Sequence, residues 1–105
     1  MTEQDYSIAR SLRERVSKIV PVLDLRVFGS HAKGTADENS DMDVFLEVPF
    51  LDRKLKNLIL DVTWEVGFKN STVISLLIFT EGELRNSPLR VSPIVENIMV
   101  EGIKI

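Results

Sequence analysis

The chain has 105 residues and a mass of 11.9 kDa, which is the size of one domain with one modest core. Its 44% hydrophobic and 28% charged residues are ordinary for a globular protein and exclude a disordered chain. A net charge of −3 lacks the basic surplus of a dedicated nucleic-acid binder, so nucleic acid is not the expected partner, although a local basic patch is still allowed.

Cysteine is absent, which excludes disulfides, thiolate metal sites and cysteine nucleophiles. The single histidine, His31, excludes metal sites built from several histidines. No apolar run approaches the roughly 18 residues that span a bilayer, and the polar, acid-containing start MTEQDYSIARS is unlike a signal peptide. We therefore expect a cytoplasmic protein, with no membrane association, folded as a single domain over residues 1–105.

The first predicted element is an amphipathic helix that ends at Pro21. Thr2 followed by Asp5 resembles a capping box, with Asp in place of the usual Glu. Apolar residues then recur at helical spacing: Ile8, Leu12, Val16, Ile19 and Val20.

A strand, a loop and a second strand follow. Leu25–Phe28 is short, apolar and β-favouring, and Met42–Val48 is the next strand, closed by Pro49. Between them, Gly29–Ser40 is rich in small and polar residues, which predicts a loop with room for one short helical turn.

The remainder predicts a second long helix over Asp52–Lys69, a buried strand over Thr72–Thr80 and a polar connector over Glu81–Ser87. A short helix over Pro93–Glu101 and a short edge strand over Ile103–Ile105 complete the chain. This order predicts an α/β (α+β) protein in which helices pack against one small sheet.

Two aspartates mark the start of the second strand. Asp41 and Asp43 are two residues apart, so they point to the same face, while Met42 and Val44 point to the other. Two carboxylates on one face repel each other unless a cation lies between them. Hard oxygen ligands suit Mg²⁺ or Mn²⁺, and Mg²⁺ is often held by one or two carboxylates together with substrate phosphates.

A Gly-Ser pair directly after the first strand adds a second chemical signal. Gly29 allows a phosphate to approach the backbone, and Ser30 contributes a hydroxyl beside backbone N–H donors. Lys33 adds positive charge. Each feature alone is common on protein surfaces, but the two meet at the same end of the predicted sheet.

The stretch VFGSHAKGTADENSDMDVFLEV resembles the signature of DNA polymerase β-like nucleotidyltransferases: Gly-Ser, about ten residues, then Asp-x-Asp. It is most similar to the minimal nucleotidyltransferases, small proteins that include MntA-type antitoxins. The ending from Ser87 to Ile105 also resembles these short proteins.

The resemblance implies a mixed β-sheet with helices packed on one side and the transfer of a nucleoside monophosphate, AMP from ATP, with Mg²⁺ or Mn²⁺. Gly29 and Ser30 would hold the β- and γ-phosphates, Gly34 would let the loop turn, and Asp41 and Asp43 would be the catalytic, metal-binding pair. The implied partner is a small helical HEPN-type toxin that the enzyme neutralises by adding AMP.

The chain departs from that family pattern at two places. His31 and Lys33 stand where relatives often have Arg, and His31 is expected either to face phosphate or to be exposed. Active members place a third carboxylate on the later strand, where this chain has Val73–Leu77 and no acid. The alternative is therefore a catalytically weak or inactive protein that neutralises a helical partner by binding.

Trp64 lies among apolar neighbours in the second long helix, which predicts a core residue or, alternatively, a partner-facing one. The nucleotide, the acceptor and the oligomeric state are left open by the sequence. A small sheet with an edge strand is compatible with a homo- or hetero-oligomer.

Overall fold

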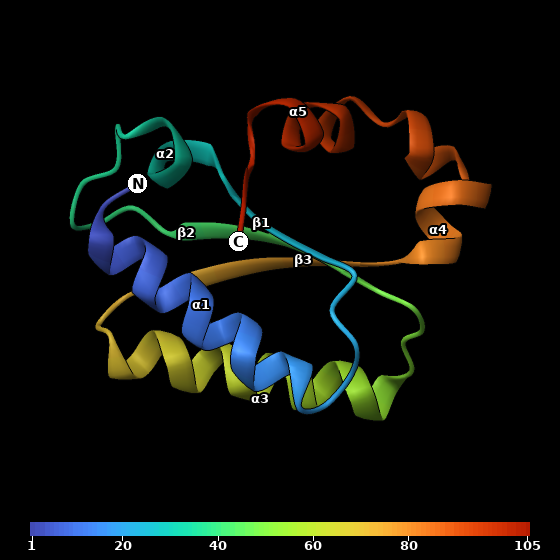
Figure 1. Ribbon diagram of the computed structural model, residues 1–105, viewed down its shortest axis with the longest axis horizontal. Helices are drawn as coiled ribbons and strands as arrows, with labels where there is room; N and C mark the ends of the chain where they lie inside the picture. Colours follow the sequence, from blue (N-terminus) through green and yellow to red (C-terminus); the bar gives the residue numbers. More distant parts are fainter.

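The computed structural model describes residues 1–105, and Figure 1 shows how their helices and strands are arranged. In chain order the elements are α1 (Glu3–Ser17), β1 (Asp24–Phe28), α2 (Gly29–Lys33), β2 (Met42–Val48), α3 (Arg53–Lys69), β3 (Ile74–Thr80), α4 (Glu81–Asn86), the 3₁₀ turn η1 (Pro88–Val91), α5 (Pro93–Glu101) and β4 (Ile103–Lys104).

The four strands form one mixed sheet in the order β3-β2-β1-β4. β1 pairs antiparallel with both β2 and β4, whereas β2 and β3 are parallel. Parallel neighbours require a long crossover connection, and α3 supplies it. The mixed sheet predicted from the sequence is confirmed, including the short final strand.

The main core lies between the sheet and the two long helices, α1 and α3, which cover the same face (Figure 1). Alternation along β2 buries every second side chain against these helices, namely Met42, Val44, Leu46 and Val48. The two long helices thus pack on one side, as expected. The capping box of α1 is also present, with Thr2 and Asp5 exchanging hydrogen bonds.

The opposite face of the sheet is covered in part by α5, and α2 lies on this side as well (Figure 1). Phe45 is fully buried here and packs against Phe79, with ring centroids 5.6 Å apart. On α5, Val95 and Ile98 are buried. Side chains of β2 that share the orientation of Phe45, including Asp43, therefore point to the face of the sheet that α2 and α5 cover in part.

Two local expectations are corrected. The segment predicted as a polar connector forms α4, because Thr80 and Glu83 complete a second capping box, a Thr-x-x-Glu pattern that is also visible in the sequence. β3 begins at Ile74 rather than Thr72, since the Thr72 N–H instead donates to the Gly67 carbonyl and closes the end of α3.

The prediction of Trp64 as a core residue is wrong. Its side chain is 67% exposed and stacks on Phe68, which is 71% exposed. Apolar residues occupy two neighbouring stripes of α3, one with Ile59 and Val66 and one with Trp64. The helical period does not show which stripe is buried, and in the structure it is the one with Ile59 and Val66. None of the helices has the length and the apolar stretch needed to cross a bilayer.

The position of Ile59 in the main core gives a stability prediction. Ile59 is fully buried, so Ile59→Ala removes buried methyl groups and leaves a cavity, and we expect it to lower the free energy of unfolding by about 2–5 kcal/mol. Lys56→Ala changes an exposed residue of the same helix and should cost less than about 0.5 kcal/mol. Urea denaturation of both variants measures this difference; equal costs would contradict the described packing.

Candidate active site

The turn that joins β1 to α2 lies directly against the carboxylate of Asp43. Phe28, the last residue of β1, pairs with Asp43 in the antiparallel ladder. Gly29 follows with φ +72°, and a Cβ atom at this position would stand 2.4 Å from Asp43 Oδ2. Both the backbone conformation and the lack of space require glycine here. The Gly-Ser turn and the second aspartate of the sequence pattern therefore meet in the fold.

The other residues of α2 spread around this turn. Ser30 is half-buried in the first turn of the helix. Gly34 ends the helix in the left-handed conformation, φ +76°, with open space where a Cβ would stand. Lys33 is exposed, and its Nζ lies 3.6 Å from Glu101 Oε2 on α5. The ammonium group thus has an acidic neighbour that an anionic ligand would have to compete with.

Asp41 and Asp43 occupy the positions that strand alternation predicts. Met42 and Val44 are fully buried in the main core, while Asp41 is exposed and Asp43 is half-buried on the other face. Burial, followed by the negative charge of Asp41, raises the pKa of Asp43 above its usual range, and positive charge at His31 acts in the opposite direction. Two acidic groups that repel each other beside an open turn are a suitable donor set for a hard divalent cation.

A third carboxylate is absent from this end of the sheet. The parallel register places Ser75 of β3 beside Asp43, where its side chain is exposed. Glu81 and Glu83 lie in α4, after the far end of β3, where Thr80 pairs with Val48. No cluster of three or more acidic or histidine residues is placed to hold a metal ion. At this end of the sheet the charges of Asp41 and Asp43 are close enough to interact, and Ser75 rather than an acid lies beside Asp43 on β3.

His31 takes neither of the two predicted positions. Its ring is largely buried: Nδ1 lies 3.1 Å from Asp5 Oδ1, and Nε2 lies 3.1 Å from the carbonyl oxygen of Ser40. In the sequence, Asp5 has the pattern of a helix cap only, and nothing there predicts this contact. The spacing of 26 residues between Asp5 and His31 carries no local signal.

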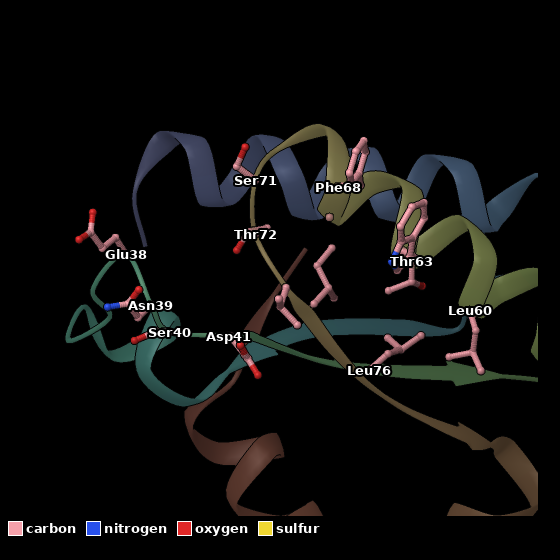
Figure 2. A pocket seen from close by; sticks show the side chains of 14 residues that line it. Glu38, Asn39, Ser40, Asp41, Leu60, Thr63, Phe68, Ser71, Thr72 and Leu76 are labelled. Atoms are coloured by element: carbon pink, nitrogen blue, oxygen red, sulfur yellow. The ribbon is translucent and has the colours of Figure 1, made fainter.

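A cavity of about 760 Å³ lies between α3, the start of β3 and the loop before β2 (Figure 2). Residues from Glu38 to Asp41 stand at one end, and Leu60 and Leu76 stand at the other. The exposed Trp64–Phe68 pair belongs to its wall. Of the predicted site residues only Asp41 lines it, so the cavity reaches one of the two aspartates but does not include the Gly-Ser turn.

Comparison with known proteins agrees with this geometry. The family described as nucleotidyltransferase domain matches residues 9–105. No protein of curated function matches in sequence.

Among solved structures, a toxin–antitoxin crystallised with AMP-PNP is similar at TM-score 0.62 and 19% identity, covering 95% of this chain and 70% of that one. The toxin–antitoxin MntA-HpeT with two Asp→Glu changes two residues apart gives TM-score 0.61 and 17% identity, with coverage of 95% and 70%. A candidate nucleotidyltransferase from Sulfolobus solfataricus gives 0.52 and 16%, with coverage of 96% and 78%.

Alanine substitutions at Gly29 and Gly34 test two effects separately: the strain of a positive φ, and the lack of space beside the Asp43 carboxylate. Gly34→Ala should cost about 1 kcal/mol of stability, because only its positive φ is unfavourable. Gly29→Ala should cost more, about 2–3 kcal/mol, because its new Cβ also displaces the Asp43 carboxylate. Urea denaturation of the two variants provides the comparison, and equal costs would argue against the Gly29–Asp43 contact.

The raised pKa of Asp43 predicts an unusual stability effect. A carboxyl whose pKa is higher in the folded than in the unfolded protein lowers stability when it is ionised, and the penalty disappears as the pH falls toward its ordinary value. Asp43→Asn should therefore raise Tm at pH 7 by a few degrees, roughly 2–4 °C for a like-charge repulsion in a chain of this size.

The gain should shrink as the pH is lowered toward about 4 and below, where the carboxyl becomes protonated in both states. Thermal melts of the native chain and of the Asp43→Asn variant, recorded between neutral and acidic pH, measure it. A lower Tm for Asp43→Asn at pH 7 would contradict the described electrostatics.

Proposed function

Because the chain belongs to the nucleotidyltransferase domain family, we propose that it transfers a nucleoside monophosphate, AMP from ATP, to a side chain of a protein partner. The observation that carries this proposal is the contact between the Gly29 backbone and the Asp43 carboxylate. It brings a turn able to receive phosphates against a pair of acidic residues, and a triphosphate with its divalent cation needs both together.

In this reaction Gly29 and Ser30 hold the β- and γ-phosphates through backbone N–H groups and the serine hydroxyl. Lys33 contributes positive charge, and Gly34 lets the loop turn back. Asp41 and Asp43 would hold Mg²⁺, or Mn²⁺, which when bound offsets negative charge on the triphosphate. The charge repulsion between the two carboxylates would be relieved by that cation, and through it they would help to hold the triphosphate.

The acceptor atom of the partner's side chain forms a bond to the α-phosphorus, and the bond from that phosphorus to the bridging oxygen breaks, which releases pyrophosphate. The proton of the acceptor group passes to water or to a group of the partner, since Ser75 lies beside Asp43 on β3, where a third carboxylate could have received it. A partner that completes the site would also restrict the reaction to that partner.

The proposed partner is a small helical toxin of the HEPN type, which the transfer neutralises. Two similar structures are toxin–antitoxins, and one of them contains AMP-PNP. In the other, the two changed aspartates have the same spacing as Asp41 and Asp43. These likenesses support an antitoxin that acts by nucleotide transfer.

A second candidate function is neutralisation by binding alone, with weak or no catalysis. Two observations favour it: the missing third carboxylate and the exposed Trp64–Phe68 pair beside Asp41. Exposed aromatic residues of this kind are typical anchors of protein interfaces. The two functions differ in whether the aspartates are required.

Calorimetric titration of Mg²⁺-ATP into the chain, with and without a helical toxin partner, tests the proposal. Asp41→Asn/Asp43→Asn should weaken binding at least about tenfold and abolish transfer of label from α-labelled ATP to the partner. Asp61→Asn makes the same chemical change at an exposed position of α3 and should leave both unchanged.

Each outcome separates the two candidates. Label transfer that depends on both aspartates supports the enzyme. Neutralisation of the partner that survives the double variant, with no label transferred by the native chain, supports the binding protein. Full transfer by the double variant would show that the site is elsewhere.

A further inference from the structure

The segment that carries Asp41 is attached to the rest of the protein at few points. Within residues 36–41, hydrogen bonds join Asp37, Asn39 and Ser40 to one another and form a self-contained turn. The one hydrogen bond that connects this segment to another part of the chain is accepted by the Ser40 carbonyl from His31 Nε2. Ser40 immediately precedes Asp41, so this contact acts one residue from the exposed carboxylate.

The His31 ring is itself held from its other side. Asp5 Oδ1 lies 3.1 Å from Nδ1, and the side chains of both residues are almost nine-tenths buried. Both partners of the ring, the Asp5 carboxylate and the Ser40 carbonyl, are hydrogen-bond acceptors, so the two ring nitrogens face one acceptor each.

Asp5 is in turn fixed by the first turn of α1. Its second oxygen, Oδ2, accepts a hydrogen bond from the Thr2 N–H at 3.1 Å, and its own N–H donates to Thr2 Oγ1 at 3.0 Å. These contacts therefore connect the start of α1, through His31 on α2, to the loop before β2. Elements far apart in the sequence meet at one buried ring.

From these contacts we propose that His31 is a positioning residue which, together with Asp5, holds segment 36–41 in place and so sets where Asp41 stands relative to the Gly29–Ser30 turn. His31 lies on α2, next to Ser30, and its ring reaches the residue before Asp41. It links the phosphate-facing half of the site to the carboxylate half. The inference rests on the proposed function for its consequence in nucleotide binding, but the restraint on the loop is independent of it.

Two readouts test the proposal, one of them independent of any activity. The amide hydrogens of Ser40 and Met42 are both hydrogen-bonded and lie on either side of Asp41. In His31→Ala they should exchange at least about tenfold faster, whereas the Ile59 amide in α3 should not change. His31→Arg offers N–H donors to the same two acceptors, so it should restore slow exchange.

The second readout is the Kd for Mg²⁺-ATP, which should rise at least about tenfold in His31→Ala and recover in His31→Arg. Arg15→Gln is the matched control, because it removes another charged contact of α1, that with Glu65 on α3, far from the loop. It should change neither readout, even if it lowers Tm as much as His31→Ala does.

The outcomes distinguish this proposal from the function on which it builds. If the native chain binds no Mg²⁺-ATP, with or without a partner, the proposed function fails, and amide exchange alone then decides whether His31 holds the loop. Unchanged exchange in His31→Ala overturns the proposal. Faster exchange with an unchanged Kd also overturns it, because the restraint would then not act on the site.

Discussion

The antiparallel pairing of β1 with β2 is the constraint on which the rest of the site depends. It places Phe28 opposite Asp43, so the chain leaving β1 must turn immediately beside a carboxylate. Gly29 makes that turn with a positive φ and without a side chain, which leaves its backbone open to a ligand. A shift of one residue in this register would move Asp43 into the main core and Val44 onto the site.

The two faces of the sheet have separate roles as a result. One face is largely apolar and is covered by α1 and α3, and this packing supplies most of the burial. The other is covered incompletely, by α2 and α5 (Figure 1), and it carries Asp43 and the fully buried Phe45. Most of the burial is therefore independent of Asp43, an unfavourably placed charge that the core on the opposite face tolerates.

The β3 edge of the sheet is where a protein partner would complete the proposed site. β3 has a strand on one side only, and its position beside Asp43 is occupied by Ser75 rather than by an acid. Next to this edge the Trp64–Phe68 pair faces outward over the cavity that reaches Asp41. Asp41 and the exposed aromatic pair line the same cavity, so a protein bound over Trp64 and Phe68 would lie near the proposed site.

Much of this protein could be predicted from local sequence patterns. The capping box of α1, the helical period of both long helices and the alternation of β2 are short-range signals, and each appears in the structure, although α1 ends at Ser17 and not at Pro21. Asp41 and Asp43 share an orientation because strand geometry alone requires it. The order of the elements predicted one small sheet with helices packed against it, and the family resemblance added that the sheet is mixed.

What only the tertiary structure decided are the contacts between residues distant in sequence. The burial of His31 between Asp5 and Ser40 joins three parts of the chain, and no periodicity encodes it. Trp64 is exposed because the rotation of α3 about its axis is set by packing against α1 and the sheet, not by its own apolar content. The sequence by itself determined which residues can do chemistry; the pairing of strands and the packing of helices determined which of them meet, because those depend on the whole chain at once.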